Sequence, residues 1–231
     1  MTLGFGPDEI EAVRISILVS TVGTLAALPF GILAAYALAR WRFPGKTLLD
    51  GLVHLPLVLP PVVTGYLLLL LLGRNGPLGA LLDQCCGIVF SFRWTGAAIA
   101  AAVMGFPLMV RAIRLSIEAV DRRLEQAAST LGAGPLGTFF AVTLPLAAPG
   151  ILAGTVLGYA KAFGEFGATI TFVGNIPGET QTLPIAIYTF IETPSGDASA
   201  MRLVALAIAI SLLALFASEL LNRRLVARLS G

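Results

Sequence analysis

Charged residues are scarce in this chain of 231 residues. Asp, Glu, Lys and Arg make up 12% of it, hydrophobic residues make up 57%, and the mean hydropathy is +0.90. Soluble domains carry about a quarter charged residues. The net charge of +2 also gives no electrostatic reason to expect a nucleic acid as partner. The composition therefore indicates an integral membrane protein.

Residue types that carry enzymatic chemistry are also scarce. The chain has one histidine, His54, and two adjacent cysteines, Cys85 and Cys86. Adjacent cysteines rarely close a disulfide or form a metal site by themselves, and a lone histidine is more typical of a hydrogen-bonded structural role. The sequence lacks the G-x-S-x-G, H-E-x-x-H and G-x-x-x-x-G-K-[ST] motifs. We therefore expect no catalytic or metal site, no cofactor, and no ATPase activity of the chain itself.

Apolar segments of membrane-spanning length occur five times. A helix needs about 20 apolar residues to cross a hydrocarbon core about 30 Å thick. The short third segment is flanked by Arg93 and Arg111, whose side chains can reach the headgroups. We expect an all-α integral membrane protein that forms a single domain over residues 1–231. Its five transmembrane helices are predicted at 15–39, 51–72, 95–110, 146–164 and 203–218.

One further apolar segment, residues 182–191, is too short to cross. It contains Pro184, so we expect it to lie at the membrane interface or to re-enter the protein.

Basic residues are distributed unevenly between the connecting segments. Alternating the five spans places ten Lys and Arg residues on one side and five on the other. Since cytoplasmic loops are enriched in Lys and Arg, we expect the N-terminus outside and the C-terminus inside. Residues 111–144 then form the longest cytoplasmic loop. The basic residues assigned to the cytoplasmic side are Arg40, Arg42, Lys46, Arg111, Arg114, Arg122, Arg123, Arg223, Arg224 and Arg228.

This loop has helical signals without the apolar length of a span. No Gly or Pro interrupts residues 124–131, and Gly132, Gly134 and Pro135 then form a stop signal. A helix this short is marginal in water unless it packs against something. The helix contains several small residues, which add little bulk, so the backbone of another protein could approach it closely. On the residues alone, a docked helix and an ordinary connecting loop are equally good interpretations.

The stretch resembles the coupling-loop signature of ATP-binding-cassette importer permeases, in which Glu-Ala-Ala, three residues, Gly, nine residues and Ile-x-Leu-Pro follow one another. Here the signature is met with intact spacing by Gln126-Ala127-Ala128, Gly132 and Val142-Thr143-Leu144-Pro145. Gln126 replaces the Glu, with Glu125 one residue earlier, and Val142 replaces the Ile.

The resemblance implies that residues 121–145 are a cytoplasmic coupling loop whose helix docks into a separate ATPase. It leaves open whether Glu125 or Gln126 makes the polar contact. The residues assigned to ATPase coupling are Glu125, Gln126, Ala127, Ala128, Leu131, Gly132, Ala133 and Pro135.

A second stretch, FGEFGATITFVGNIPGETQTLPIAIYTFI at 163–191, is similar to the corresponding region of molybdate permease subunits. This resemblance implies a permease that translocates molybdate or tungstate by alternating access in the bacterial inner membrane. The implied assembly is a homodimer with two cytoplasmic ATPase copies, which bind ATP and Mg, and a periplasmic oxyanion-binding protein. Sulfate and thiosulfate permeases share a related GNIP stretch and are the first alternative. An ion-gradient-driven secondary transporter is the alternative from another class, although it would usually show inverted repeats.

Several polar or kinked positions inside the spans are candidates for the translocation path. Three prolines within six residues, Pro56, Pro60 and Pro61, free backbone groups in a manner often found along a pathway. Lys161 and Glu165 are four residues apart, and they form either a structural pair or a pair in which the lysine attracts the oxyanion. Threonine hydroxyls could donate to an oxyanion or bond their own backbone. The path candidates are Pro60, Thr64, Lys161, Glu165, Thr169 and Thr171.

Overall fold

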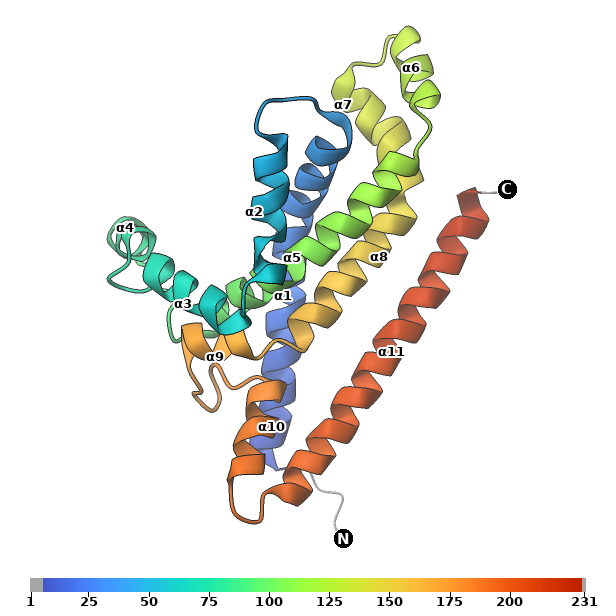
Figure 1. The fold of residues 1–231 in the computed structure, drawn as a ribbon. Coiled ribbons are helices and arrows are strands. Elements are labelled where there is room, and N and C mark those ends of the chain that lie inside the picture. The colour runs from blue at the N-terminus through green and yellow to red at the C-terminus, as the bar shows by residue number, and fades with distance from the viewer. Residues whose placement is uncertain (1–5, 230–231) are drawn as a thin grey trace.

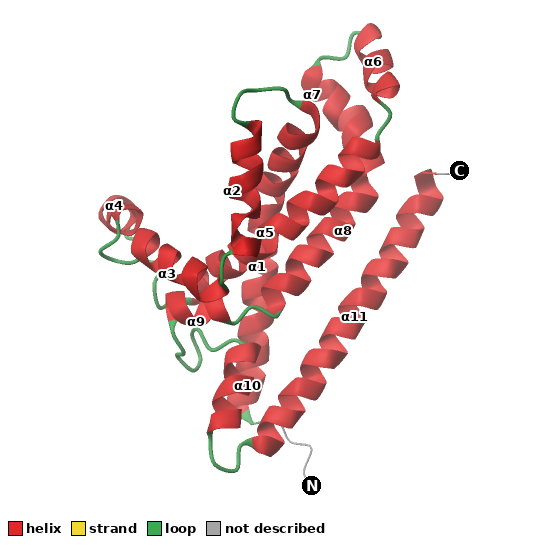
Figure 2. Cartoon of the chain, in the orientation of Figure 1, coloured by secondary structure: helices red, strands yellow, loops and turns green. Residues whose placement is uncertain are grey.

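The computed structural model describes residues 6–229, without the side chains of residue 218 and of residues 221–229. Every regular element in this range is a helix (Figure 2). The elements in chain order are α1 (Pro7–Arg40), α2 (Lys46–Val58), α3 (Pro61–Leu72), α4 (Pro77–Cys86), α5 (Trp94–Ala119), α6 (Arg122–Thr130), α7 (Pro135–Thr138), the π-helix η1 (Phe139–Thr143), α8 (Leu144–Phe163), α9 (Gly167–Val173), α10 (Leu183–Glu192) and α11 (Asp197–Leu229).

Three long helices, α1, α5 and α8, form the centre of the molecule (Figure 1). Small residues let them approach closely. A Cβ atom on Gly105 of α5 would lie 2.6 Å from the carbonyl oxygen of Gly158 on α8, and one on Gly23 of α1 would lie 2.5 Å from the carbonyl oxygen of Ala98. No side chain larger than hydrogen fits at either crossing. Such close contacts are the usual basis of helix association in membranes, because the lipid removes the hydrophobic driving force.

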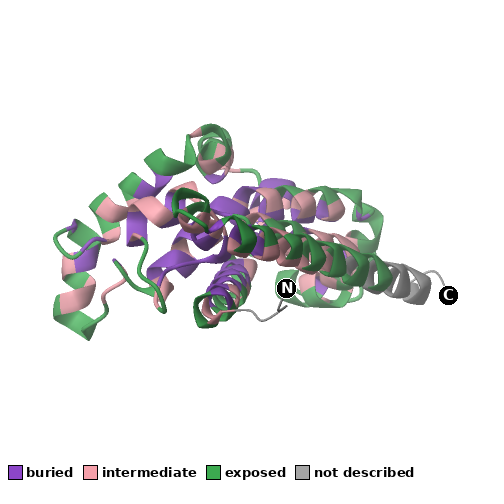
Figure 3. Ribbon diagram, turned by 90° about the horizontal axis from the view of Figure 1, so that it is seen from below, coloured by how far each residue is buried: buried purple, intermediate pink, exposed green. Residues whose placement is uncertain are grey.

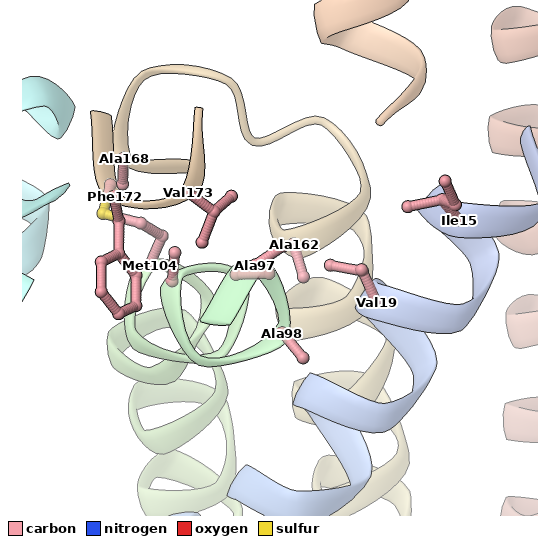
Figure 4. Packing of buried hydrophobic residues seen from close by; sticks show 11 residues of the cluster. Ile15, Val19, Ala97, Ala98, Met104, Ala162, Ala168, Phe172 and Val173 are labelled. Atoms are coloured by element: carbon pink, nitrogen blue, oxygen red, sulfur yellow. The ribbon is translucent and has the colours of Figure 1, made fainter. Parts of the chain in front are cut away.

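One apolar core lies where these helices meet α9 (Figure 4). Phe172 and Val173 of α9 are fully buried, together with Ala97 of α5, and Val19 of α1 is 2% exposed. Buried residues gather at such helix contacts, whereas the outer helix faces are exposed (Figure 3). The core therefore holds the short helix α9 firmly against the bundle.

Helix α11 lies at the side of this bundle and packs on α10 and α8 (Figure 1). Only 11% of its apolar window, within Asp197–Ala217, is buried. Leu213 and Phe216 are 69% and 64% exposed. An apolar surface of this kind is stable in lipid or against another protein, and not in water.

The number of spans is four or five. Four helical stretches are long and apolar enough to cross, namely Pro7–Arg40, Trp94–Ala119, Pro135–Phe163 and Asp197–Ala217. The fifth predicted span, residues 51–72, is not a continuous helix. It consists of parts of α2 and α3, which are bent by 116° relative to each other.

The bend has a local cause in two consecutive prolines. Pro60 and Pro61 lack the N–H group that a continuing helix needs, and a residue before proline is driven out of the helical region. Leu59 has ψ 142° and Pro60 has ψ 135°, both in the extended range. Helix α3 starts afresh at Pro61, where the missing N–H group costs nothing.

Two other predicted boundaries differ from the structure. The span predicted at 95–110 continues to Ala119, so Arg111 and Arg114 lie on α5 instead of in a loop. At the other end, helical structure resumes at Pro135 and runs through η1 into α8. The segment 182–191 forms the short helix α10, which confirms that it is too short to cross in one piece. The side chains of Arg223, Arg224 and Arg228, which entered the charge count, lie outside the described part of the chain.

Candidate functional site

Helix α6 lies at one end of the molecule, beyond the ends of the long helices (Figure 1). It begins after Asp121, whose side chain accepts a hydrogen bond of 2.9 Å from the backbone N–H of Arg123. It ends at Leu131, and Gly132 follows with φ +90°. This left-handed conformation favours glycine, so the predicted stop signal at Gly132 is confirmed. None of the nine residues of α6 is buried.

The free end of the molecule carries exposed leucines. Leu124 is 48% exposed, Leu131 89% and Leu136 of α7 75%. Ala128, which lies between Leu124 and Leu131 in the sequence, is half-buried. Large apolar side chains at such a position gain free energy when a partner covers them, at about 25 cal/mol for each Å² removed from water. The surface formed by Leu124, Ala128 and Leu131, which are three or four residues apart along one helix face, is called the leucine surface below.

A polar network attaches the inner side of α6 to the bundle. The Nε atom of Arg40, the last residue of α1, lies 3.1 Å from both carboxylate oxygens of Glu125. Thr143 of η1 donates a hydrogen bond of 2.7 Å to Oε1 of Glu125. Arg40 also donates from Nη2 to the carbonyl oxygen of Val120, at 2.8 Å. The network therefore joins the ends of α1, α5 and α8 to α6.

Glu125 and Gln126, the two candidates for the polar contact of the coupling signature, lie in different surroundings. Glu125 is half-buried and bonded within the chain, whereas Gln126 is exposed. Both line a cleft of about 730 Å³ between α6, α7 and the end of α1. Of the two, Gln126 is the one whose side chain is available to a partner.

The other coupling candidates lie around the turn between α6 and α7. The N–H group of Ala133 donates to the carbonyl oxygen of Ala128, at 3.0 Å, which closes the end of the helix. Ala127 is exposed, and Pro135 opens α7. The coupling candidates thus lie on α6 and on the turn that follows it, with Glu125 bonded to the bundle and Gln126 exposed.

The candidates for the translocation path converge on the contact between α3 and α9. A Cβ atom on Gly65 would lie 2.4 Å from the carbonyl oxygen of Ala168, so the two helices touch through their backbones. Thr64 is 5% exposed, and its hydroxyl oxygen has no hydrogen-bond partner among the described residues. Thr169 is 1% exposed. Thr171 donates to the carbonyl oxygen of Gly167, at 2.7 Å, so it bonds its own helix backbone.

Pro60 and the charged pair lie beside the same contact. Pro60 is exposed and caps the start of α3. The Nζ atom of Lys161 lies 2.7 Å from Oε2 of Glu165, so the predicted pair forms, although α8 ends two residues before Glu165. Oε1 of Glu165 accepts a hydrogen bond of 3.0 Å from the N–H group of Ala168 on α9.

Several contacts between ionisable side chains were not predicted from the sequence, and two of them show why. Arg40 was assigned only to a charged side of the membrane, and its partner Glu125 is 85 residues away, so no local pattern reveals the pair. Asp50 lies four residues before His54, and its carboxylate is 3.2 Å from Nδ1 of the imidazole. Helical spacing was sufficient to find the second contact.

The long apolar helices, together with a short helix that extends beyond their ends, define a multi-pass membrane protein. Residues 27–230 match a family model described as binding-protein-dependent transport system inner membrane component. The chain belongs to this family of inner-membrane transport components.

Two curated relatives and one solved structure show how far the similarity extends. The molybdenum transport system permease protein ModB of Escherichia coli (strain K12) is 59% identical over 215 residues, which are 93% of this chain and 94% of the relative. The sulfate transport system permease protein CysT of Salmonella typhimurium (strain LT2) is 36% identical over 97% of this chain and 80% of the relative. A bacterial alginate ABC transporter in complex with alginate pentasaccharide-bound periplasmic protein shares the fold, with a TM-score of 0.74, 16% identity, and coverage of 95% of this chain and 80% of that chain.

Proposed function

We propose that this chain is the membrane permease subunit of an ATP-driven importer of molybdate or tungstate in the bacterial inner membrane. The observation that carries the proposal is the 59% identity to a molybdenum transport permease over 93% of the chain. The chain is not itself an enzyme, and in this proposal a separate ATPase binds ATP and Mg and hydrolyses the nucleotide.

The leucine surface is the proposed docking site for that ATPase. Helix α6 is too short to be stable by itself, and both Leu124 and the residue that caps its end, Leu131, are exposed. The coupling-loop spacing falls on this same helix and on the turn at Gly132. A groove on the ATPase that receives α6 would cover Leu124 and Leu131, and exposed Gln126 would supply the polar contact.

The proposed assembly is a homodimer of this chain with two ATPase copies inside and an oxyanion-binding protein outside. One chain offers a single coupling helix, and two ATPase copies need two. Closed symmetric pairs are also the commonest assemblies of identical subunits. The proposed orientation has the N-terminus outside and the C-terminus inside, supported by the ratio of ten to five basic residues.

Transport is proposed to follow alternating access. ATP-driven closure of the ATPases would move the two α6 helices, and this motion would switch the packing of the long helices between two arrangements. The oxyanion would pass near the contact of α3 and α9. Thr64 supports this placement, since its buried hydroxyl has no partner among the described residues and could donate to a passing oxyanion.

Sulfate import is the second candidate, because the chain is also 36% identical to a sulfate permease over 97% of its length. The difference between 59% and 36% favours molybdate. Both oxyanions are tetrahedral dianions, so a permease could pass either, and selection would then rest on the binding protein.

Reconstitution tests the proposal directly. The chain, its ATPase and its binding protein are placed in liposomes, and uptake of molybdate, tungstate and sulfate is measured with ATP inside. We expect molybdate and tungstate uptake that requires ATP and the ATPase, and little uptake of sulfate. Uptake driven by a proton or sodium gradient without ATP would identify a secondary transporter and would refute the proposal. Preferential uptake of sulfate would favour the second candidate.

A further inference from the structure

Arg40 occupies an unusual position for a basic residue at the end of a membrane helix. Such residues normally extend into the headgroup region, but the Arg40 side chain is only 8% exposed. Two bonded groups surround it, the carboxylate of Glu125 on α6 and the carbonyl oxygen of Val120 at the end of α5. The guanidinium group therefore connects three helices at one point.

The carboxylate of Glu125 extends this connection to a fourth helix. Its Oε1 atom accepts the hydroxyl of Thr143, which is fully buried in η1. Since η1 continues directly into α8, the end of α8 is attached to the same carboxylate. A π-helical turn inside a longer helix is often found at functional positions. The bond from Thr143 lies in this turn.

These hydrogen bonds fix both the distance and the direction between the Glu125 carboxylate of α6 and its partners on α1 and η1. None of the residues of α6 is buried, so apolar packing fixes its orientation weakly. The Glu125 side chain is 17% exposed, and a partly desolvated ion pair is strengthened by the lower local dielectric. The orientation of α6 relative to α1 and α8 thus depends on the charged pair.

We propose that Arg40 is a positioning residue of the coupling mechanism, which transmits displacement of α6 to α1 and α8 together. This inference rests on the proposed function, because it requires α6 to be moved by an ATPase. When the pair is intact, movement of α6 displaces Glu125, and Glu125 carries the ends of α1 and α8 with it. Without the pair, α6 can turn without displacing α1, and the ATPase completes its cycle without switching the permease.

The test is the number of molybdate ions transported for each ATP hydrolysed by the complete reconstituted complex. Arg40→Met removes the charge and keeps a side chain of similar length. We expect the variant to retain the ATPase and to hydrolyse ATP, with the ratio lowered on the order of tenfold, as the loss of a hydrogen bond to a charged group would cause. A purely structural role would lower transport and hydrolysis in proportion and leave the ratio unchanged, which would overturn the inference.

Three further variants sharpen the test. Arg42→Met removes an exposed arginine two residues later and should leave the ratio at the wild-type value. Arg40→Lys keeps the charge, so it should recover part of the ratio. Glu125→Gln keeps the shape of its side chain and should lower the ratio as Arg40→Met does. If the Arg40→Met protein does not assemble, the ratio of Glu125→Gln decides, and a wild-type value there would overturn the inference.

Failure of the inference is distinguishable from failure of the proposed function. Ala128→Trp places bulk on the leucine surface and leaves both members of the charged pair unchanged. If Ala128→Trp abolishes ATPase binding while the Arg40 and Glu125 variants keep the wild-type ratio, the docking proposal stands and the role of Arg40 is wrong. If Ala128→Trp binds the ATPase normally, docking through α6 is itself wrong.

Discussion

The Nζ atom of Lys161 lies 2.7 Å from Oε2 of Glu165, and the Glu165 side chain is only 2% exposed. The other carboxylate oxygen is bonded to the backbone N–H of Ala168. Both oxygens of Glu165 thus have partners inside the chain, and the residue joins the end of α8 to the start of α9. The arrangement supports a structural pair more than a lysine free to attract an oxyanion.

The first prediction concerns this pair. Lys161→Met leaves a buried carboxylate without its counter-ion, a change that costs about 3–5 kcal/mol in buried pairs. We expect the lower end of that range, since Lys161 is 32% exposed, and a lower melting temperature of the purified protein in detergent. The double variant Lys161→Met, Glu165→Gln has no unpaired charge and should recover most of the loss.

The double variant also separates the two interpretations of Lys161. A structural pair predicts that the double variant imports molybdate with nearly wild-type affinity. If it is as stable as the wild-type protein but its uptake requires far more molybdate, Lys161 acts on the oxyanion, and the structural interpretation is wrong. Uptake over a range of molybdate concentrations is the measurement.

Short-range signals explain which parts of the structure could be predicted. Helix α6 was predicted at 124–131 and is found at Arg122–Thr130, because a stop signal is local in the sequence. The pair of Lys161 and Glu165 was predicted because residues four apart meet on a helix turn. Apolar length likewise located the four long helices to within about ten residues.

Contacts between residues far apart in the sequence, and the bend between α2 and α3, could not be predicted in this way. Arg40 and Glu125 meet across 85 residues, and only the packing of α1 against α5 and α8 brings them together. Hydropathy also runs unbroken through residues 51–72, since proline in a window of leucine and valine lowers the average little. The 116° bend at Pro60 is a property of backbone sterics and not of hydropathy.

The second prediction concerns the contact of α3 with α9. Gly65→Ala adds a Cβ atom that would lie 2.4 Å from the carbonyl oxygen of Ala168 and 2.9 Å from Cβ of Thr171. The backbones have to separate, and overpacking of this kind costs about 1–3 kcal/mol. We expect a melting temperature several degrees lower. Gly51→Ala is the matched control, since a Cβ atom there meets nothing within 4 Å. Equal stability of the two variants would contradict the observed contact.

The third prediction concerns docking through the leucine surface. Leu131→Gln exchanges an 89% exposed leucine for a polar side chain of similar size, so the subunit itself should lose no more than about 0.5 kcal/mol. Its ATPase partner would lose an apolar contact worth about 1.5–3 kcal/mol when fully covered. We expect weaker copurification of the ATPase, and a complete loss with Ala128→Trp.

Bulk at an exposed position on the far end of the molecule provides the control for docking. Thr193→Trp places the same side chain after α10, and it should leave the amount of copurified ATPase unchanged. Expression level and the size of the purified permease should match the wild type in every variant. Normal ATPase recovery with both Leu131→Gln and Ala128→Trp would show that this surface does not contact the ATPase.

The fourth prediction concerns orientation in the membrane. Helix α6 and the end of α10 lie at opposite ends of the molecule, with the long helix α8 between them in sequence (Figure 1). Single cysteines at exposed Ser129 and Thr193 report the two sides, after the exposed native Cys85 and Cys86 have been replaced by serine. In intact spheroplasts, a membrane-impermeant maleimide should label Thr193→Cys and leave Ser129→Cys unlabelled until the membrane is permeabilised.

This outcome follows from the excess of basic residues on the side of α6, because Lys and Arg are retained in the cytoplasm. Labelling of both cysteines from outside would mean that the chain between them crosses an even number of times, and the single crossing by α8 would be wrong. The reverse pattern, with Ser129→Cys alone labelled, would invert the orientation and place α6 out of reach of any cytoplasmic ATPase.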